Sequence, residues 1–189
     1  MTIVLILAAV VLVTAVIIVF NRLIRLRNAR STAWSDIDVQ LKRRHDLVRN
    51  VVEVVRGYTD FERTTLEQVT AARGQAVAAL DSGDPARAGQ AEGELAGGMR
   101  RLFALAEAYP QLKASEHFLE LQRTLVDLED DIQNARRYYN AVVRDLNTRI
   151  QSFPDLLVAR PLGFREGKFF EIESPEEAEV PRAGWEGKA

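Results

Sequence analysis

The 189-residue sequence contains no cysteine and only two histidines, so several kinds of chemistry have no residues to carry them. Without cysteine the chain can form no disulfide, no thiolate metal site and no thiol nucleophile. Di-iron helical proteins need the motif Glu-x-x-His, but neither His45 nor His117 has a glutamate three residues earlier. The glycine motifs that bind phosphate are also missing. These absences predict a protein that is not an enzyme and that holds no metal or cofactor.

Neither sign of charge is in clear excess, because 25 basic residues face 27 acidic ones and the net charge is −2. The strongly basic balance of a general nucleic-acid binder is therefore missing, and no nucleic-acid partner is predicted. Charge is nevertheless uneven, with arginines concentrated in residues 21–44 and glutamates in residues 171–189. We interpret the basic run Lys42–His45 as a solvated helix face, with His45 and His117 at the surface or at a bundle edge.

Proline and glycine are scarce, with 6 and 11 residues respectively. Between them, apolar residues recur at intervals of three and four, which is the helical period, and no sustained alternation indicates a strand. The sequence therefore predicts an all-α chain. Helices are expected from residue 21 to about 56, from 60 to about 80, from 85 to about 108 and from 116 to about 152.

Polar residues mark the expected helix starts, and these signals are Thr59 with Glu62 as a capping box, Asp84 before Pro85, and Ser115. The helix expected from residue 85 is unusually rich in glycine. Gly89, Gly93 and Gly97 lie four residues apart on one face, and each costs about 1 kcal/mol relative to alanine. This row indicates either a seam of close packing or a weak helix.

One long hydrophobic run is present. Residues Ile3 to Phe20 are all apolar except Thr14. As a helix, 18 residues extend about 27 Å, close to the roughly 30 Å of a bilayer core. A cleaved signal peptide would have a basic region before a shorter apolar stretch and a small-residue cleavage site after it, and neither is present. The run therefore predicts a retained transmembrane helix, residues 1–20, that continues into the helix from residue 21.

Basic residues follow this run directly, and they are Arg22, Arg25, Arg27 and Arg30. Positive charge beside a span stays on the cytoplasmic side. We therefore expect a single-pass protein of the inner membrane, with the N-terminus outside and residues 21–189 in the cytoplasm. The same arginines can contact anionic lipid headgroups, but their role as a topology signal is sufficient to explain them.

The region from residue 116 to 152 has the most regular apolar stripe, typical of a helix bundle or coiled coil. Its members are Phe118, Leu121, Leu125, Leu128, Ile132, Ala135, Tyr139, Val142, Leu146, Ile150 and Phe153. A second, polar row accompanies it, formed by Asn134, Arg137, Asn140, Arg144, Asn147 and Gln151. This row predicts either a buried hydrogen-bond network with Asp38, Gln40 or Asn50, or a groove for a partner or a lipid headgroup.

The last fifth of the chain, after this helix, changes character. Phe153-Pro154 ends the helix, and residues 156–164 form an apolar patch flanked by arginines. This patch either touches the bilayer or straps the end of the bundle. Residues 171–189 have too few apolar residues to fold and are expected to form a flexible acidic tail. The predicted organisation is thus an anchor, residues 1–20, an antiparallel bundle of four long helices, residues 21–170, and the tail.

Three blocks of the sequence resemble the LemA family of bacterial membrane proteins. They are Arg25–Asn28 with Ala33–Arg44 and Asp46-Leu47; Leu105–Lys113 with Phe118–Gln122; and Ala135–Asn140 with Val143–Asp145 and Asn147–Pro154. The resemblance implies one N-terminal span and a cytoplasmic four-helix bundle, with no catalytic residues. It also suggests a membrane protease or a TPM-domain protein as a partner. Arg49 stands where the family usually has proline, so a kink there is expected to be weaker.

Two functional hypotheses follow. The first is a non-enzymatic, membrane-anchored scaffold or adaptor that self-associates, because a long stalk with an apolar stripe suits assembly. The second is an accessory subunit of a membrane protease or of an envelope-stress enzyme.

Overall fold

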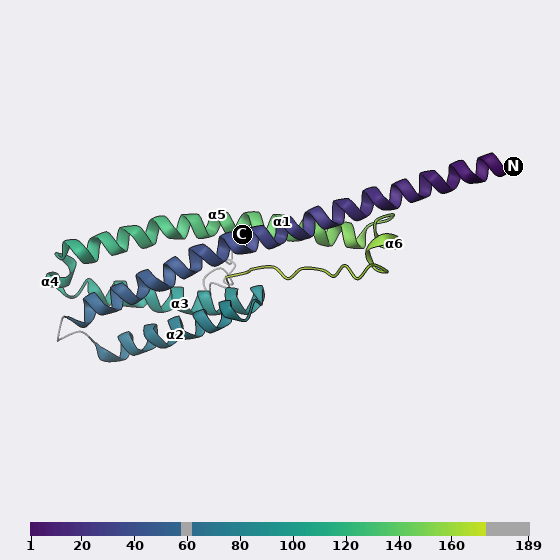
Figure 1. Cartoon of the computed structure of the whole chain (residues 1–189). Coiled ribbons are helices and arrows are strands. Elements are labelled where there is room, and N and C mark those ends of the chain that lie inside the picture. Colours follow the sequence, from purple (N-terminus) through teal and green to yellow (C-terminus); the bar gives the residue numbers. More distant parts are fainter. Residues whose placement is uncertain (58–61, 173–189) are drawn as a thin grey trace, which may run out of the picture.

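A computed structural model describes residues 1–57 and 62–172 (Figure 1). The described parts are helical and contain no strand, which confirms the all-α prediction. The elements are α1 (Thr2–Arg56), α2 (Arg63–Asp81), α3 (Pro85–Ala106), α4 (Pro110–Lys113), α5 (Glu116–Gln151) and α6 (Leu156–Ala159). Of the acidic tail predicted for residues 171–189, only residues 171 and 172 are described, and the remainder lies outside the described residues.

Helix α1 is a single helix of 55 residues, about 80 Å long at 1.5 Å per residue. Its first part carries an 18-residue window of mean hydropathy 3.5, of which none is buried, so by length and composition it can cross a membrane. The helix continues through Arg49 without a break. The expected continuity between the apolar run and the following helix is therefore confirmed.

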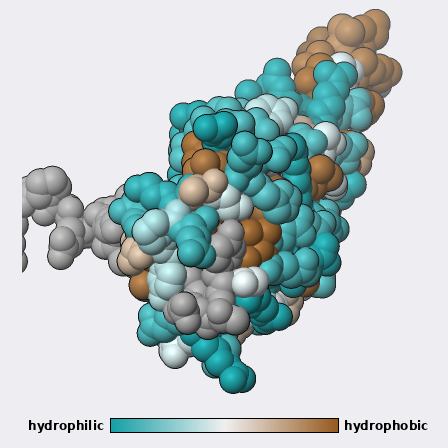
Figure 2. Space-filling model, turned by 90° about the vertical axis from the view of Figure 1, so that its left-hand side faces the viewer, coloured by the Kyte–Doolittle hydropathy of each residue, from teal (hydrophilic) through white to brown (hydrophobic). Residues whose placement is uncertain are grey.

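Helices α1, α2, α3 and α5 run side by side and form what we call the helical body, residues 21–57 and 62–172 (Figure 1). Helix α5 runs antiparallel to α1, while α2 and α3 form a hairpin packed mainly on itself and on α1. We call the end of the body near Leu23 the base and the end at α4 the distal end. Viewed from the distal end, the body is mostly hydrophilic, and the apolar start of α1 projects behind it (Figure 2).

The interior divides into three apolar clusters along the axis. Representative members are Val55, Leu102 and Phe118 in the distal cluster, Ile37, Ile132 and Phe170 in the middle cluster, and Leu23, Leu146 and Ala159 in the basal cluster. The stripe of α5 contributes to all three, as its helical spacing predicts. Phe153 is the exception, because its side chain is 79% exposed beyond the end of α5.

Helix starts agree with the sequence where a side-chain cap forms. Asp84 Oδ1 accepts a hydrogen bond from Ala86 N at 3.1 Å, and Ser115 Oγ accepts one from Phe118 N at 3.4 Å. Helix α2 begins three residues later than predicted, with Glu62 as its N-cap and no side-chain cap bond. Thr59, the other half of the expected capping box, lies outside the described residues.

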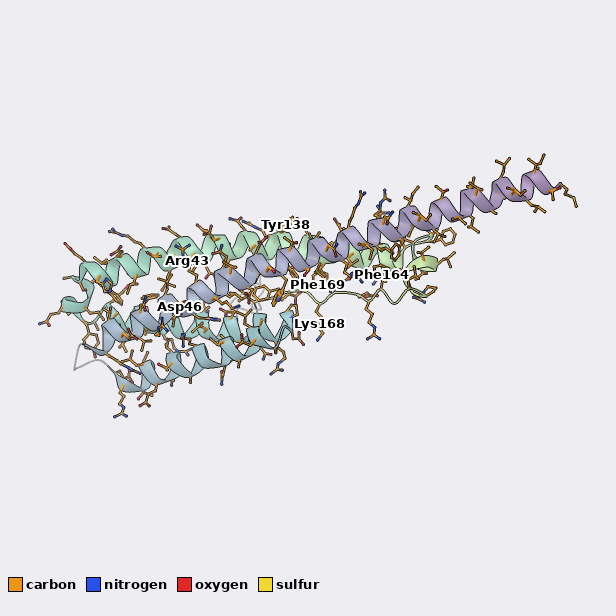
Figure 3. The ribbon with its side chains drawn as sticks, in the orientation of Figure 1. Arg43, Asp46, Tyr138, Phe164, Lys168 and Phe169 are labelled. Atoms are coloured by element: carbon orange, nitrogen blue, oxygen red, sulfur yellow. The ribbon has the colours of Figure 1, made fainter. Side chains whose placement is uncertain are left out.

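After α6 the chain turns back and follows the body as an extended segment, residues 164–172, which we call the strap (Figure 1). It lies under α1 and α5 and ends near the α2–α3 hairpin. The two neighbouring tyrosines of α5 lie in different environments, because Tyr138 points outward while Tyr139 is buried against Trp34 (Figure 3). Trp34 is partly buried in the middle cluster, where it contacts the strap through Phe170.

Candidate functional site

Two asparagines of α5 bind the backbone of the strap. Asn140 Nδ2 donates to Phe170 O and Asn140 Oδ1 accepts from Phe170 N, both at 2.9 Å. Asn147 makes the same pair with Gly167, at 3.0 and 2.8 Å. Seven residues of helix rise about 10.5 Å, and three residues of extended chain span about 10 Å. The spacing of the two amide side chains along α5 therefore matches the spacing of Gly167 and Phe170 along the strap. Each amide pairs with the strap backbone as a peptide group of a neighbouring strand would.

Burial reinforces this attachment. Phe170 is fully buried in the middle cluster, with its ring 5.9 Å from that of Trp34. The Tyr139 hydroxyl donates to Lys168 O at 2.9 Å. Burial raises the pKa of that hydroxyl above its ordinary value, so it remains a donor at neutral pH. The strap is therefore part of the interior along this stretch.

The strap also contacts the α2–α3 hairpin. A Cβ added to Gly89 would lie 2.1 Å from Glu171 O, so the strap crosses α3 where only glycine fits. Lys168 Nζ bonds Asp84 Oδ2 at 2.7 Å. That hydrogen bond holds the pKa of the Asp84 carboxyl below its ordinary value of 3.8. Of the glycine row, Gly89 thus serves close packing, whereas Gly97 has only the end of Arg101 within 4 Å.

The polar row of α5 divides between two environments. Asn140 and Asn147 bind the strap rather than Asp38, Gln40 or Asn50, so the predicted partners of these two residues were wrong. Asn134 and Gln151 are exposed, and Asn134 accepts from Arg137 at 2.6 Å. Arg137 and Arg144 line a groove together with Asn140. The sequence placed these residues on one face but could not identify what they bind, because the strap arrives from a segment 20–30 residues later.

The groove lies between α2, α3, α5 and the end of the strap and has a volume of about 1380 Å³. We call it the arginine groove after the four basic residues in its lining, Arg101, Arg136, Arg137 and Arg144. Glu94 and Glu171 are the acidic residues among those that line it. The rest of the lining includes glutamines, such as Gln68 and Gln90, and small or apolar residues, such as Gly93 and Ile172. Four arginines against two acidic residues make this lining net positive, so it can bind carboxylates through paired hydrogen bonds.

A buried ionic cluster lies deeper, between α1, α3 and α5. His45 Nε2 is 2.6 Å from Glu92 Oε1, and Arg44 Nη1 is 3.4 Å from Glu92 Oε2 and 3.3 Å from Glu129 Oε2. His45, Arg44 and Glu92 are 3%, 6% and 1% exposed. The interpretation of residues 42–45 as a solvated face was therefore wrong for Arg44 and His45, although Lys42 is exposed and His117 lies at the surface.

A signal for this cluster exists in the sequence. The apolar stripe of α1 jumps from Leu41 to Val48, and Arg44 and His45 occupy the helical positions between them. A polar residue at a position of the stripe lies on the same helix face as the apolar residues, so it is buried where that face packs against another helix. Glu92 meets both basic side chains, so the cluster links α3 to α1. Within residues 1–57 and 62–172, no three histidine or acidic side chains gather closely enough to hold a metal ion.

The sequence pattern of the LemA family matches residues 33–183, which is most of the chain. The chain belongs to the LemA family. Protein LemA of Metamycoplasma hominis is 28% identical over 161 residues, covering 85% of this chain and 72% of that protein. Magnetosome protein MamQ 2 of Paramagnetospirillum magneticum is 22% identical, covering 88% of this chain and 70% of its own length. Magnetosome protein MamQ of Magnetospirillum gryphiswaldense is also 22% identical, with 87% and 69% covered.

The LemA-like blocks contain the residues that organise the strap. Tyr139, Asn140 and Asn147 lie in the third block, and Trp34 and Arg44 lie in the first. These side chains bind the strap or join the buried ionic cluster. The resemblance thus rests on residues that build the body of this LemA-family protein.

The arginines after the apolar run of this LemA-family protein do not all face outward. Arg22 and Arg25 are exposed. The guanidinium carbon of Arg27 lies 5.7 Å from the centre of the Phe164 ring, a cation–π contact. A Cβ on Gly167 would come within 3.0 Å of Arg30 Nη1, so Arg30 lies against the strap. Arg27, although exposed, and Arg30 therefore also contact the segment around residues 164–167.

Proposed function

We propose that this LemA-family protein is a non-enzymatic adaptor, anchored in the inner membrane with its body in the cytoplasm. The observation that carries the proposal is the unbroken helix α1, which joins the apolar run to the distal end of the helical body. Such a helix holds the docking surface of the body at a set height above the bilayer. A tag at the carboxyl end should therefore resist protease added to intact cells, and its cleavage from outside would overturn the orientation.

The arginine groove is the proposed docking surface. Phe170 lines the groove and its ring lies 5.9 Å from that of Trp34, so one end of the groove lies near the height of Trp34 on α1. Trp34 is 14 residues beyond Phe20, about 21 Å along the helix. The groove thus lies within reach of a partner that is itself in or on the membrane. Arginines bind carboxylates through paired hydrogen bonds, so the partner chemistry is an extended segment rich in aspartate or glutamate.

Site-specific photo-crosslinking in membranes tests this surface. A photoreactive residue at position 144, inside the groove, is compared with one at position 123, which is exposed on the same helix but does not line the groove. We expect a crosslinked partner from position 144 only, and its yield should fall with added salt because charge pairs are screened. Equal yields from both positions would remove the groove from the proposal.

Self-association forms part of the same proposal. The stripe of α5 is buried within the body, so contact between copies is assigned to the membrane helix. Ala8 and Ala15 lie seven residues apart on one face, and small residues allow membrane helices to approach closely. The chain has no cysteine, so oxidising single-cysteine variants in membranes gives a clean test. Ala8→Cys and Ala15→Cys should form dimers more readily than Val10→Cys, which lies on the opposite face of the helix, and a monomer at all three positions contradicts the assignment.

A second candidate is an accessory subunit of a membrane protease or an envelope-stress enzyme. The height of the groove above the apolar run favours it, because that is where the cytoplasmic parts of a membrane enzyme lie. Deleting the gene should change the turnover of membrane proteins, and the groove variant Arg144→Glu should reproduce that change whereas Arg123→Glu should not. Unchanged turnover on deletion rules this candidate out.

A further inference from the structure

The chain returns to the end of the apolar run after α5. We call residues 152–164, which include α6, the basal loop. The ring of Phe164 packs edge-on against that of Phe20, with 6.0 Å between centroids. Ala159 is fully buried in the basal cluster with Leu23, and Val19 packs against the same cluster. Figure 1 shows that this loop is the part of the body nearest the apolar start of α1, and Figure 3 shows Phe164 beside that helix.

The basal loop exposes large apolar side chains. Phe153, Leu157 and Leu162 are 79%, 64% and 53% exposed. Among the described residues beyond Phe20, the other strongly exposed large apolar side chains are Val39, Val126 and Tyr138, scattered over α1 and α5. Scattered apolar residues are ordinary at a surface, but three within ten residues at one end of a molecule mark a contact surface.

The contact with Phe20 sets the height of this surface. If residues 3–20 cross the hydrocarbon core, Phe20 lies at its edge. Phe164 touches both Phe20 and Arg27, which are seven residues or about 10 Å apart along α1. A headgroup layer is about 5–8 Å thick on each side of the core. The basal loop therefore occupies the level of the headgroups beside the span.

Charge at this level is mainly positive. Arg22, Arg25, Arg160 and Arg165 are exposed around the loop. Asp155 is buried and accepts from Arg149 at 3.2 Å, so its charge is already compensated. Glu166 is an exposed acidic residue of the adjoining strap. Exposed arginines beside exposed apolar side chains are the combination that binds an anionic bilayer surface.

We propose that the basal loop is a second membrane contact, which places Phe153, Leu157 and Leu162 among the headgroups of anionic phospholipids. This inference rests on the membrane anchor of the proposed function and adds a property that a span alone lacks. A single helix is free to rotate about its axis and to tilt. A second contact to one side of the helix removes that freedom. It sets the rotation of the body about the helix axis, and hence the direction in which the arginine groove faces relative to the membrane.

Single-cysteine labelling of the full chain in lipid nanodiscs tests the proposal. A fluorophore is attached at Leu157→Cys or Leu162→Cys, and the matched control is Val126→Cys, which is as exposed as Leu157 at 62% but lies on α5 within the body. Lipids with a nitroxide on the headgroup should quench the two loop labels several-fold more than the control. A water-soluble nickel complex should instead quench the Val126 label more than the two loop labels.

Lipid charge provides the second arm. Quenching at the loop should be stronger in nanodiscs of phosphatidylglycerol than of phosphatidylcholine, and Arg160→Gln with Arg165→Gln should abolish that difference, whereas Arg123→Gln should not. The proposal is overturned if the lipid nitroxide quenches the loop labels no more than the Val126 label. A label at Val11→Cys separates the two claims. If the Val11 label is quenched by lipid nitroxide but the loop labels are not, the basal-loop proposal fails and the anchor stands. If the Val11 label is not quenched either, the anchor itself fails.

Discussion

Replacing Gly89 with alanine probes the crossing of the strap over α3. In an ordinary helix this change is favourable by about 1 kcal/mol, because glycine has the lower helix propensity. Here the new Cβ would lie 2.1 Å from Glu171 O, whereas carbon–oxygen contacts are about 3.3 Å or longer. The strap must therefore retreat by about 1 Å, since the obstructing atom belongs to its backbone.

The retreat has a definite energetic cost. The two 2.9 Å hydrogen bonds between Asn140 and Phe170 would stretch beyond bonding distance, a loss of about 1 kcal/mol each. Phe170 would also leave part of its cavity, and full removal of such a ring costs about 3–5 kcal/mol. We count a quarter to a half of this packing cost, add the two lost hydrogen bonds and subtract the gain in helix propensity of about 1 kcal/mol. The net destabilisation is then about 2–3 kcal/mol.

Gly97→Ala is the matched control, because it is the same change in the same helix and only the end of Arg101 lies within 4 Å. It should stabilise the protein by about 1 kcal/mol. Both variants are unfolded with urea in detergent, in a Trp185→Phe background in which Trp34 is the only tryptophan. Helical dichroism gives the free energy, and Trp34 fluorescence reports the loss of Phe170. If the two alanines stabilise equally, the strap does not cross at Gly89 and the reasoning fails.

Three further outcomes are expected. Asn147→Leu breaks both bonds to the strap at that position and should cost about 2 kcal/mol, with faster amide exchange in the strap; unchanged exchange there would contradict the pairing. Glu92→Leu removes the acidic partner of His45 and leaves the buried Arg44 with Glu129 alone, so it should cost about 3–5 kcal/mol. Glu129→Leu, at a side chain 38% exposed, should cost under about 1 kcal/mol, and similar losses for the two variants in urea unfolding would argue against the cluster. Because the folded pKa of Asp84 is depressed, its contribution to stability is present above pH 3.8 and is lost as pH falls through the folded value. Lys168→Met should return the pKa of the Asp84 carboxyl, followed by NMR, toward 3.8. An unchanged pKa in that variant would refute the ion pair.

The helices, most of their ends and the apolar start of α1 were predictable from local patterns. Asp84 before Pro85 marks a helix start because its side chain bonds the backbone two residues on, and this interaction needs no distant partner. The run from Ile3 to Phe20 indicates a span by length and composition alone. Spacing likewise places Asn140 and Asn147 on one face of α5, because helical periodicity is a property of the sequence.

Tertiary structure decided what those faces meet. His45 and Glu92 are 47 residues apart, and their contact exists only because α3 folds onto α1. The strap is invisible to periodicity, since it is extended and its backbone, rather than its side chains, bonds Asn140 and Asn147. Local patterns therefore determined which segments are helical and which one suits a bilayer. Burial, the arginine groove and the basal loop were decided by long-range packing, because the environment of a side chain depends on elements that no neighbouring residue encodes.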